Sequence, residues 1–204
     1  MTLTEAQQRA SVPRHVTIEW TCQPSESSSH PEPSHPLTIR IEPATERDVP
    51  LILRLIRALA EYERLTHQVV ATEAALQATL FGPAPAAEVV IAYADEQPAG
   101  FALWFQNYST FLARPGLYLE DLFVLPEWRG HGVGRQLLSH LARVAVERGC
   151  GRMEWSVLDW NEPAIGFYRK LGAAVMEDWR ICRLTGDTLA ALARTTAAES
   201  GGER

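Results

Sequence analysis

Arg129-Gly130-His131-Gly132-Val133-Gly134 is the stretch of sequence that decides the fold. It lies between a β-rich run over 117–124 and a run over 132–148 whose apolar residues recur at helical spacing. Glycines in such a turn let the backbone adopt positive φ and approach a ligand closely. The first amides of a helix lack intrahelical acceptors and carry the positive end of its dipole. The stretch therefore predicts a strand–turn–helix unit that suits a pyrophosphate.

Two familiar phosphate-binding motifs do not account for this turn. The Walker A string Gly-x-x-x-x-Gly-Lys-Ser/Thr is absent from the sequence. The dinucleotide-binding fingerprint requires a third glycine where Arg135 stands, and the order of the surrounding strands differs. What remains is Arg-x-x-Gly-x-Gly, carried by Arg129, Gly132 and Gly134. The alternative is an ordinary glycine-rich turn without a ligand.

The runs on either side of the turn predict the other elements. One helix is expected to begin at the caps Thr45 and Asp48, and a second to begin at Thr72. A further helix is expected over 161–171, and one or two helical turns over 185–194. The turn at 95–98 predicts an antiparallel hairpin, and the strand–helix alternation after it predicts parallel pairing. The fold class is therefore α/β (α+β), with one mixed, twisted sheet and helices on both faces. The expected strands are 37–41, 88–94, 100–106, 117–124, 153–158 and 174–184.

Composition and charge exclude several classes of protein. The 204 residues are 46% hydrophobic and carry 19 Lys and Arg against 25 Asp and Glu, a formal net charge of -6. The apolar fraction is that of a globular domain, and no basic bias favours nucleic acid. No stretch is long and apolar enough for a membrane span, the first ten residues lack a secretory signal, and three scattered cysteines form no metal cluster. We expect a cytoplasmic protein that uses neither membrane nor metal.

The domain organisation follows from where the apolar patterning begins and ends. Residues 1–36 include a Ser/Pro-rich stretch and are expected to form a disordered extension. The folded domain is predicted over 37–194, and a flexible tail over 195–204.

Four strings together resemble the GNAT superfamily of N-acetyltransferases, and within it the spermidine/spermine (diamine) N-acetyltransferase branch. They are the glycine turn 129–134, Leu-Glu-Asp-Leu-Phe-Val at 119–124, Trp-Asn-Glu-Pro-Ala-Ile-Gly-Phe-Tyr at 160–168, and Ala-Leu-Ala-Glu-Tyr-Glu at 58–63. The resemblance spans roughly 37–192. It implies the acyl-CoA N-acyltransferase fold and transfer of acetyl from acetyl-CoA to a primary amine of a small molecule, polyamine, diamine or thialysine-like. It also implies a homodimer.

The resemblance implies roles for individual residues. Tyr168 matches the acid that protonates the departing thiolate, and Glu120 matches an acceptor-site carboxylate. Tyr62 and Glu63 match acceptor-binding positions. The implied contacts to acetyl-CoA are the strand backbone at Leu122, Phe123 and Val124, the turn residues Arg129, Gly130, His131, Gly132, Val133, Gly134 and Arg135, and the helix start at Asn161, Glu162, Pro163 and Ala164.

Acetylation of an amine has physical requirements that these residue types can meet. An alkyl ammonium has a pKa of about 10.4, so its deprotonation at pH 7 costs roughly 4.6 kcal/mol. Glu120 interrupts an apolar strand, where a carboxylate is costly unless it is used or paired, so it is a candidate proton acceptor or amine anchor. For its neighbour Asp121 a structural hydrogen-bonding role is also plausible. Tyr168 lies two helical turns after Asn161, on the same broad face, with a phenol that can donate a proton.

Each assignment has a structural alternative. Glu120 can be a salt-bridged strand carboxylate and Tyr168 a half-buried helix tyrosine, while Tyr62 and Glu63 can belong to an ordinary amphipathic face. Arg129 can pair with phosphate or lie on the surface. Two further functions stay open: a non-catalytic acyl-CoA-binding sensor, and acetylation of a protein amino terminus or lysine. Several aromatic residues are expected mainly in the core, among them Trp104, Phe105, Trp155 and Trp160.

Overall fold

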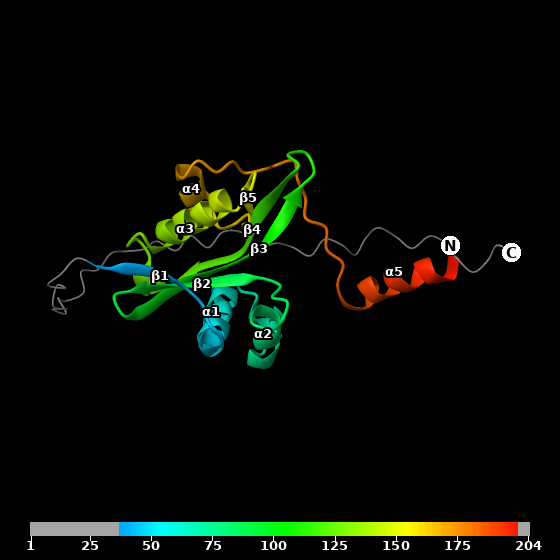
Figure 1. Ribbon diagram of the computed structural model, residues 1–204, viewed down its shortest axis with the longest axis horizontal. Coiled ribbons are helices and arrows are strands. Elements are labelled where there is room, and N and C mark those ends of the chain that lie inside the picture. Colours follow the sequence, from blue (N-terminus) through cyan, green and yellow to red (C-terminus); the bar gives the residue numbers. More distant parts are fainter. Residues whose placement is uncertain (1–36, 200–204) are drawn as a thin grey trace, which may run out of the picture. The chain divides into compact units, whose positions relative to one another are not determined.

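The computed structural model describes residues 37–199 (Figure 1). The predicted extension over 1–36 and the end of the predicted tail, 200–204, lie outside the described residues. Five strands form one sheet in the order β1-β2-β3-β4-β5. The strands β1 to β4 pair antiparallel and β5 pairs parallel to β4, which confirms the predicted mixed sheet. The strands are β1 (Ile39–Pro43), β2 (Glu88–Ala94), β3 (Gln97–Ser109), β4 (Arg114–Val124) and β5 (Met153–Trp155).

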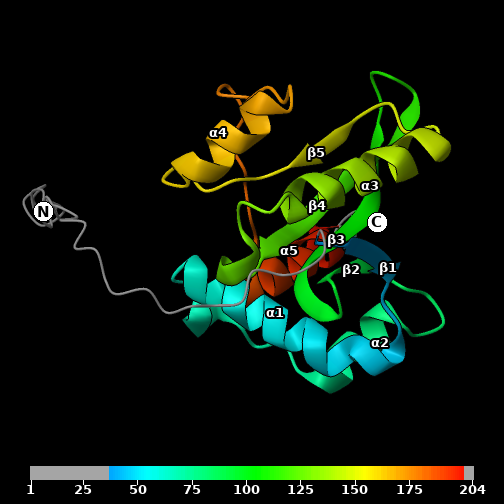
Figure 2. The ribbon, with the colours of Figure 1, turned by 90° about the vertical axis from the view of Figure 1, so that its left-hand side faces the viewer.

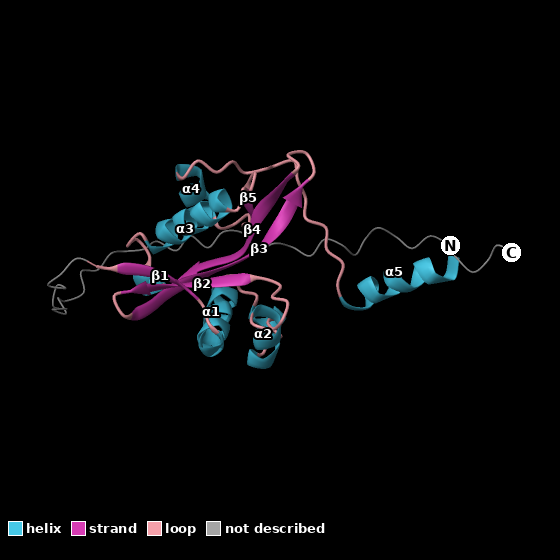
Figure 3. Ribbon diagram, in the orientation of Figure 1, coloured by secondary structure: helices cyan, strands magenta, loops and turns pink. Residues whose placement is uncertain are grey.

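Helices cover both faces of this sheet, as the sequence predicted. Figures 1 and 2 show α1 (Val49–Tyr62) and α2 (Glu73–Leu80) on one face and α3 (Val133–Glu147) and α4 (Glu162–Lys170) on the other. Figure 3 shows α5 as the last helix. It spans Gly186–Glu199 and so continues past the predicted domain end at 194. Within residues 37–199, no helix has the length and apolarity that crossing a bilayer requires. Short 3-10 turns occupy Glu46–Asp48, Thr66–Gln68 and Pro126–Trp128.

The start of α1 is fixed by a local exchange of hydrogen bonds. The backbone amide and hydroxyl of Thr45 both donate to Asp48 Oδ2, at 2.7 and 2.8 Å, and the Asp48 amide donates to the Thr45 carbonyl. This exchange directs the apolar stripe of the helix onto the sheet, where Ile52 and Leu55 are buried against Phe101 of β3. The opposite face of the sheet is covered by the stripe of α3 with buried Val133, Leu137, Leu138, Leu141 and Ala145.

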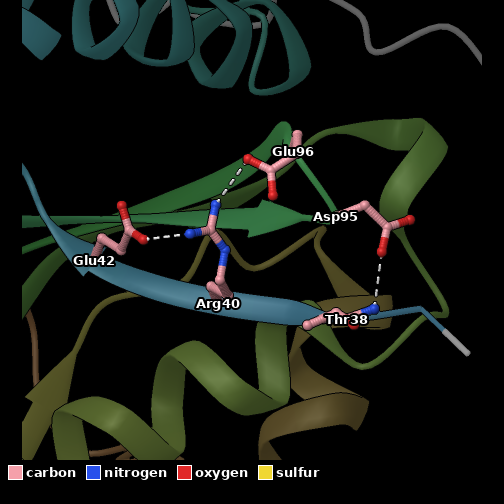
Figure 4. Close-up of polar contacts among 5 residues, drawn as sticks. All are labelled: Thr38, Arg40, Glu42, Asp95 and Glu96. Atoms are coloured by element: carbon pink, nitrogen blue, oxygen red, sulfur yellow. Dashed lines mark hydrogen bonds and ion pairs between the residues drawn. The ribbon is translucent and has the colours of Figure 1, made fainter.

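The outer edge of the sheet, at β1, is held by polar contacts to the β2–β3 turn (Figure 4). The Thr38 amide donates to Asp95 Oδ1 at 3.0 Å, and the Asp95 amide donates back to the Thr38 carbonyl at 2.7 Å. Arg40 forms ion pairs with Glu42 and Glu96, at 2.8 and 3.3 Å. Because these ion pairs are exposed, each contributes at most about 1 kcal/mol. Together these contacts hold β1 against the β2–β3 turn.

An irregularity in β4 sets which way its acidic residues face. Asp121 lies opposite Leu103 and Leu119 lies opposite Trp104, so Glu120 has no partner in the register between β3 and β4. Asp121 therefore lies on the face of the sheet that carries Leu103, which packs against the core beneath α1. The bulge thus places Asp121 on the face of the sheet that α1 covers.

Three expected elements differ in the structure. No strand forms over 174–184, since within residues 37–199 no neighbouring strand supplies the hydrogen bonds that an extended segment needs. We name residues 174–192 the C-terminal arm, because its side chains are exposed from end to end. The strand β5 ends at Trp155 rather than at 158, and the helical turn expected over 185–194 is a helix of 14 residues.

Candidate functional site

The glycine turn has the geometry that the sequence predicts. Gly130 and Gly132 have φ of 80° and 88°, values that side chains other than glycine rarely adopt. Gly132 is the N-cap of α3, and its carbonyl accepts the amide of Gln136 at 3.0 Å. The amides of residues 133–135 therefore precede the first hydrogen bond of the helix. A side chain added at Gly130 or Gly132 would meet nothing within 4 Å, so the turn is open to an approaching group.

The end of β4 next to this turn also has an open backbone edge. The parallel pairing with β5 runs from Leu117 opposite Met153 to Leu119 opposite Trp155. Beyond that point residues 120–124 have no partner on this side among the described strands. The edge and the turn together fit a long ligand that carries amide groups and a diphosphate, which are the chemical features of coenzyme A.

Arg129 joins the turn to the strand and to α1. Its Nε donates to the Val124 carbonyl at 3.0 Å. Its guanidinium carbon lies 4.5 Å from the ring centroid of Tyr62 and 5.6 Å from that of Phe123. Such cation–π contacts contribute about 0.5–2 kcal/mol, depending on solvent exposure. Arg129 is exposed, so the structure agrees with the surface position that the sequence left open, and its guanidinium also contacts the two aromatic rings.

A hydrogen bond connects the end of α1 to the start of α4. The Tyr62 hydroxyl donates to Asn161 Oδ1 at 3.0 Å, and the same oxygen accepts the Ala164 amide at 3.3 Å as the N-cap of α4. Asn161 is only 9% exposed, so this bond is protected from water. The Trp160 ring lies 5.8 Å from that of Tyr62. The predicted acceptor residue on α1 and the predicted cofactor residue at α4 are thus in direct contact.

Tyr168 lies against the sheet in the second turn of α4. Its ring makes an edge contact with Trp155 of β5, with 5.1 Å between centroids. Burial, and then the charges of Glu63 and Tyr62, raise the pKa of Tyr168 to about 12. The phenol therefore keeps its proton at neutral pH, as a proton donor requires.

The acidic residues differ in their surroundings. Burial, and then the charges of Glu120 and Glu63, raise the pKa of Asp121 from 3.8 to about 6. Burial also raises the pKa of Glu63. Glu120, in contrast, is exposed. The desolvated carboxylate is therefore Asp121, for which the sequence suggested a structural role, and not Glu120.

The predicted residues divide into two groups. Tyr62, Glu63, Asn161 and Tyr168 come together with Phe123 at the meeting point of α1, β4 and α4. His131 and Arg135 are exposed on the turn, where His131 Nδ1 lies 2.9 Å from the Arg129 carbonyl. Among the remaining predicted cofactor contacts, Leu122, Val124 and Ala164 are half-buried, and Glu162 and Pro163 are exposed.

Sequence reasoning missed Trp160. It was expected in the core, but it is 51% exposed, and its ring is tilted against that of Tyr62. The sequence held one indication of this contact. Trp160 immediately precedes the N-cap Asn161, and an apolar residue at that position often packs against a neighbouring side chain. Trp104 is buried as expected, whereas Phe105 and Trp155 are half-buried.

Two surface cavities lie at other places in the fold. One, of about 600 Å³, is lined by the first turns of α1 and α2 and includes Arg47 and Gln77. The other, of about 400 Å³, is lined by Trp104 and by His140 of α3. Neither is lined by the glycine turn or by Tyr168.

Comparisons with known proteins agree with this geometry. The sequence model described as "Acetyltransferase (GNAT) family" matches residues 53–173. An L-ornithine N5-acetyltransferase from Arabidopsis thaliana is 38% identical, covering 82% of this chain and 94% of that protein. A thialysine N-epsilon-acetyltransferase from Bos taurus is 40% identical, covering 76% and 97%.

Solved structures share the fold. An integron cassette protein from V. cholerae superposes with a TM-score of 0.65 at 26% identity, covering 76% of this chain and 98% of that one. An aminoglycoside N-acetyltransferase in complex with CoA superposes with a TM-score of 0.61 at 22% identity, covering 75% and 99%. The second likeness shows the fold alone.

Proposed function

Because the chain belongs to the acetyltransferase (GNAT) family, we propose that it transfers acetyl from acetyl-CoA to a primary amine at the end of an aliphatic chain, as in a polyamine, a diamine or a thialysine-like amino acid. Relatives named for ornithine N5 and thialysine N-epsilon acetylation support this substrate class. A spermidine/spermine N(1)-acetyltransferase-like protein from Homo sapiens is 31% identical over 74% of this chain and 23% of that protein, and it agrees with this class. The single observation that carries the proposal is the open turn at Gly130–Gly132 at the start of α3, and the raised pKa of the Tyr168 phenol is consistent with it.

Binding of acetyl-CoA is assigned to backbone groups. The amides of residues 133–135, at the start of α3, would hold its diphosphate. The unpaired edge of β4 at Leu122–Val124 would pair with its pantetheine arm, and Asn161–Ala164 would form a further contact. When bound, acetyl-CoA supplies an activated acetyl thioester. The exposed side chains of His131 and Arg135 then contribute less than the amides between them.

Tyr168 is assigned as the acid that protonates the leaving sulfur. Its raised pKa keeps the proton on the phenol until a thiolate forms. Tyr62 and Glu63 are assigned to the amine site, since they lie at the end of α1 and act electrostatically on Tyr168. Glu120 is retained as an acceptor-site carboxylate, where its exposed negative charge favours an approaching ammonium.

A thiol-release assay with acetyl-CoA and a panel of primary amines tests the proposal. Turnover is expected with ornithine, thialysine, lysine or short polyamines. Tyr168→Phe is expected to lower kcat by 10-fold or more, with Tyr118→Phe as the control, because the Tyr118 hydroxyl contacts Ser156 outside the cluster. Absence of turnover across the panel, or a Tyr168→Phe rate equal to that of the control, would contradict the assignment.

We further propose a homodimer in the cytoplasm. The C-terminal arm supports the dimer, because Trp179 and Ile181 are 72% and 70% exposed and a second copy could cover them. Among the described strands β5 has no neighbour on its outer side, and this edge is a complementary surface for a strand from that copy. The free thiols Cys150 and Cys182 support a reducing compartment.

A further inference from the structure

The cavity of about 400 Å³ lies at the start of β2, where β1 has left the sheet. The last pair between these two strands is Pro43 opposite Val90. The Ala44 amide then donates to the Val89 carbonyl at 2.9 Å, and the chain turns into the 3-10 helix Glu46–Asp48. Toward its first residue, β2 has no partner on this side among the described strands. The departure of β1 therefore leaves room beside the sheet that the neighbouring elements do not fill.

The loop after α2 forms one wall of this cavity. Half-buried Phe81 and Ala87 line it together with exposed Pro85. The Ala86 amide donates to the Thr79 carbonyl at 2.8 Å, which holds the loop against α2, and the ring of a proline fixes the backbone torsion φ at its own position. The wall is therefore apolar and held in place locally, as the walls of small-molecule sites commonly are.

The end of α3 forms another wall. His140, Val144 and Arg148 line the cavity, and because they recur at every fourth residue they lie in one row along the helix. The Arg148 guanidinium binds both carboxylate oxygens of Glu88, with Nη2 at 2.7 Å from Oε2. Burial, and then the charge of Arg143, lowers the pKa of His140, so its ring is neutral at pH 7. The two lining residues that carry charge at this pH therefore neutralise each other, which favours an uncharged ligand.

A buried polar group of this cavity has no partner. Trp104 lines the cavity and is 4% exposed, and its Nε1 forms no hydrogen bond with any of the described residues. Leaving a buried N–H unpaired is costly, and an indole can only donate, so the missing partner is an acceptor. Because this nitrogen is shielded from water, the acceptor has to enter on an apolar body that packs against the walls, with a small shift of the indole ring.

We propose that this cavity binds an uncharged, mainly apolar molecule with one carbonyl oxygen, which accepts the indole N–H of Trp104. The volume of the cavity lies within the range of roughly 300–1,000 Å³ that is typical of small-molecule sites. Neither the glycine turn nor Tyr168 lines it, so the ligand is distinct from acetyl-CoA and from the amine, and its binding does not depend on the proposed acetyl transfer.

The indole N–H signals in the NMR spectrum of the full chain, labelled with ¹⁵N, test this site. The chain has six tryptophans, and the signal that is missing in Trp104→Phe belongs to Trp104. Acetophenone, an aromatic ketone, is the probe, and ethylbenzene, which has no oxygen, is the matched control. Acetophenone is expected to move the Trp104 proton signal downfield in a saturable way, because the ketone oxygen accepts its hydrogen bond. Ethylbenzene should give no downfield shift of this signal.

Substitutions that fill the cavity locate the probe. Val144→Trp should raise the Kd for acetophenone about tenfold or more, since the larger side chain takes the place of the ligand. Ala142→Trp, at an exposed position of α3 that does not line the cavity, is the control and should leave the Kd within about twofold. Ala87→Leu, in the loop wall, should weaken binding without a change in α3, and the indole signals of the other tryptophans show whether each variant keeps its fold.

Three results overturn the proposed ligand site. They are a Trp104 signal that acetophenone does not move, an equal downfield shift with ethylbenzene, and an unchanged Kd in folded variants with a filled cavity. None of them bears on acetyl transfer, because the titration involves no turnover.

Discussion

The hydroxyl of Tyr62, the last residue of α1, donates to Asn161 Oδ1, the cap of α4, across 99 positions of sequence. Because that oxygen also accepts the Ala164 amide, one atom both begins α4 and holds it to α1. Tyr168 lies seven residues further along α4, so its position relative to Glu63 depends on this contact. The bond therefore couples the predicted amine site to the predicted acid.

Tyr62→Phe removes this hydrogen bond and keeps the ring. The loss is expected to lower the free energy of unfolding by about 1 kcal/mol, because a nearly buried acceptor loses a partner, and to lower kcat several-fold. Urea unfolding and steady-state kinetics measure the two effects. Tyr118→Phe is the matched control, since its hydroxyl bond to Ser156 is exposed. Equal effects of the two substitutions would mean that the Tyr62 bond has no special role.

Gly132→Ala tests the turn. At a φ of 88° a Cβ is strained by roughly 1–2 kcal/mol although nothing obstructs it, so the turn should relax and the KM for acetyl-CoA should rise about tenfold. Gly166→Ala in α4 is the matched control, because it also meets no atoms but has no positive φ. The control should leave KM unchanged and stabilise the helix slightly. A normal KM in Gly132→Ala would count against the turn as the diphosphate site.

The pH dependence of stability follows from Asp121. Because its folded pKa of about 6 exceeds the ordinary 3.8, the folded state binds more protons in this window, and stability falls as pH rises through it. The shift corresponds to about 3 kcal/mol. Asp121→Asn should flatten this slope and raise the free energy of unfolding at pH 7 by about 1–3 kcal/mol. Urea unfolding at pH 4, 5, 6 and 7 measures it, and a slope equal to that of wild type would refute the desolvated state of Asp121.

The C-terminal arm predicts the oligomeric state. Light scattering of the full chain, of 22.7 kDa, should give twice that mass. Trp179→Asp combined with Ile181→Asp should give the monomer, because charges cannot replace apolar side chains at a dry contact. Val146→Asp, at a 78% exposed position of α3, is the control and should stay dimeric. A wild-type monomer, or a dimer insensitive to the arm, would contradict the proposal.

Local signals predicted most of the fold from the sequence. Thr45, Asp48, Thr72 and Asn161 act where short-range hydrogen bonds decide the ends of helices, and the structure confirms these starts. The sequence predicted that glycines in the turn allow positive φ, and Gly130 and Gly132 adopt it. Helix caps and tight turns depend on neighbours within a few residues, so they can be predicted from one sequence.

Features that depend on distant partners could not be predicted. The run over 174–184 has strand-like composition, yet no strand forms because pairing is decided by what lies beside it. Trp160 was expected in the core because aromatic residues are commonly buried, and its contact with Tyr62 is a contact between distant elements that the sequence does not show. The desolvation of Asp121 likewise depends on the face that the sheet register selects.

The unpaired Glu120 changes the parity of its strand. Uninterrupted alternation would assign Leu117, Leu119 and Phe123 to one side of the sheet. The pairing with β3 instead places the two leucines and Phe123 on opposite sides, and all three are buried. One strand thereby supplies both hydrophobic layers of the domain. Without the extra residue Glu120, Asp121 would lie on the same side as Leu117 and Leu119. Because of it, Asp121 lies with Phe123 on the side that α1 covers.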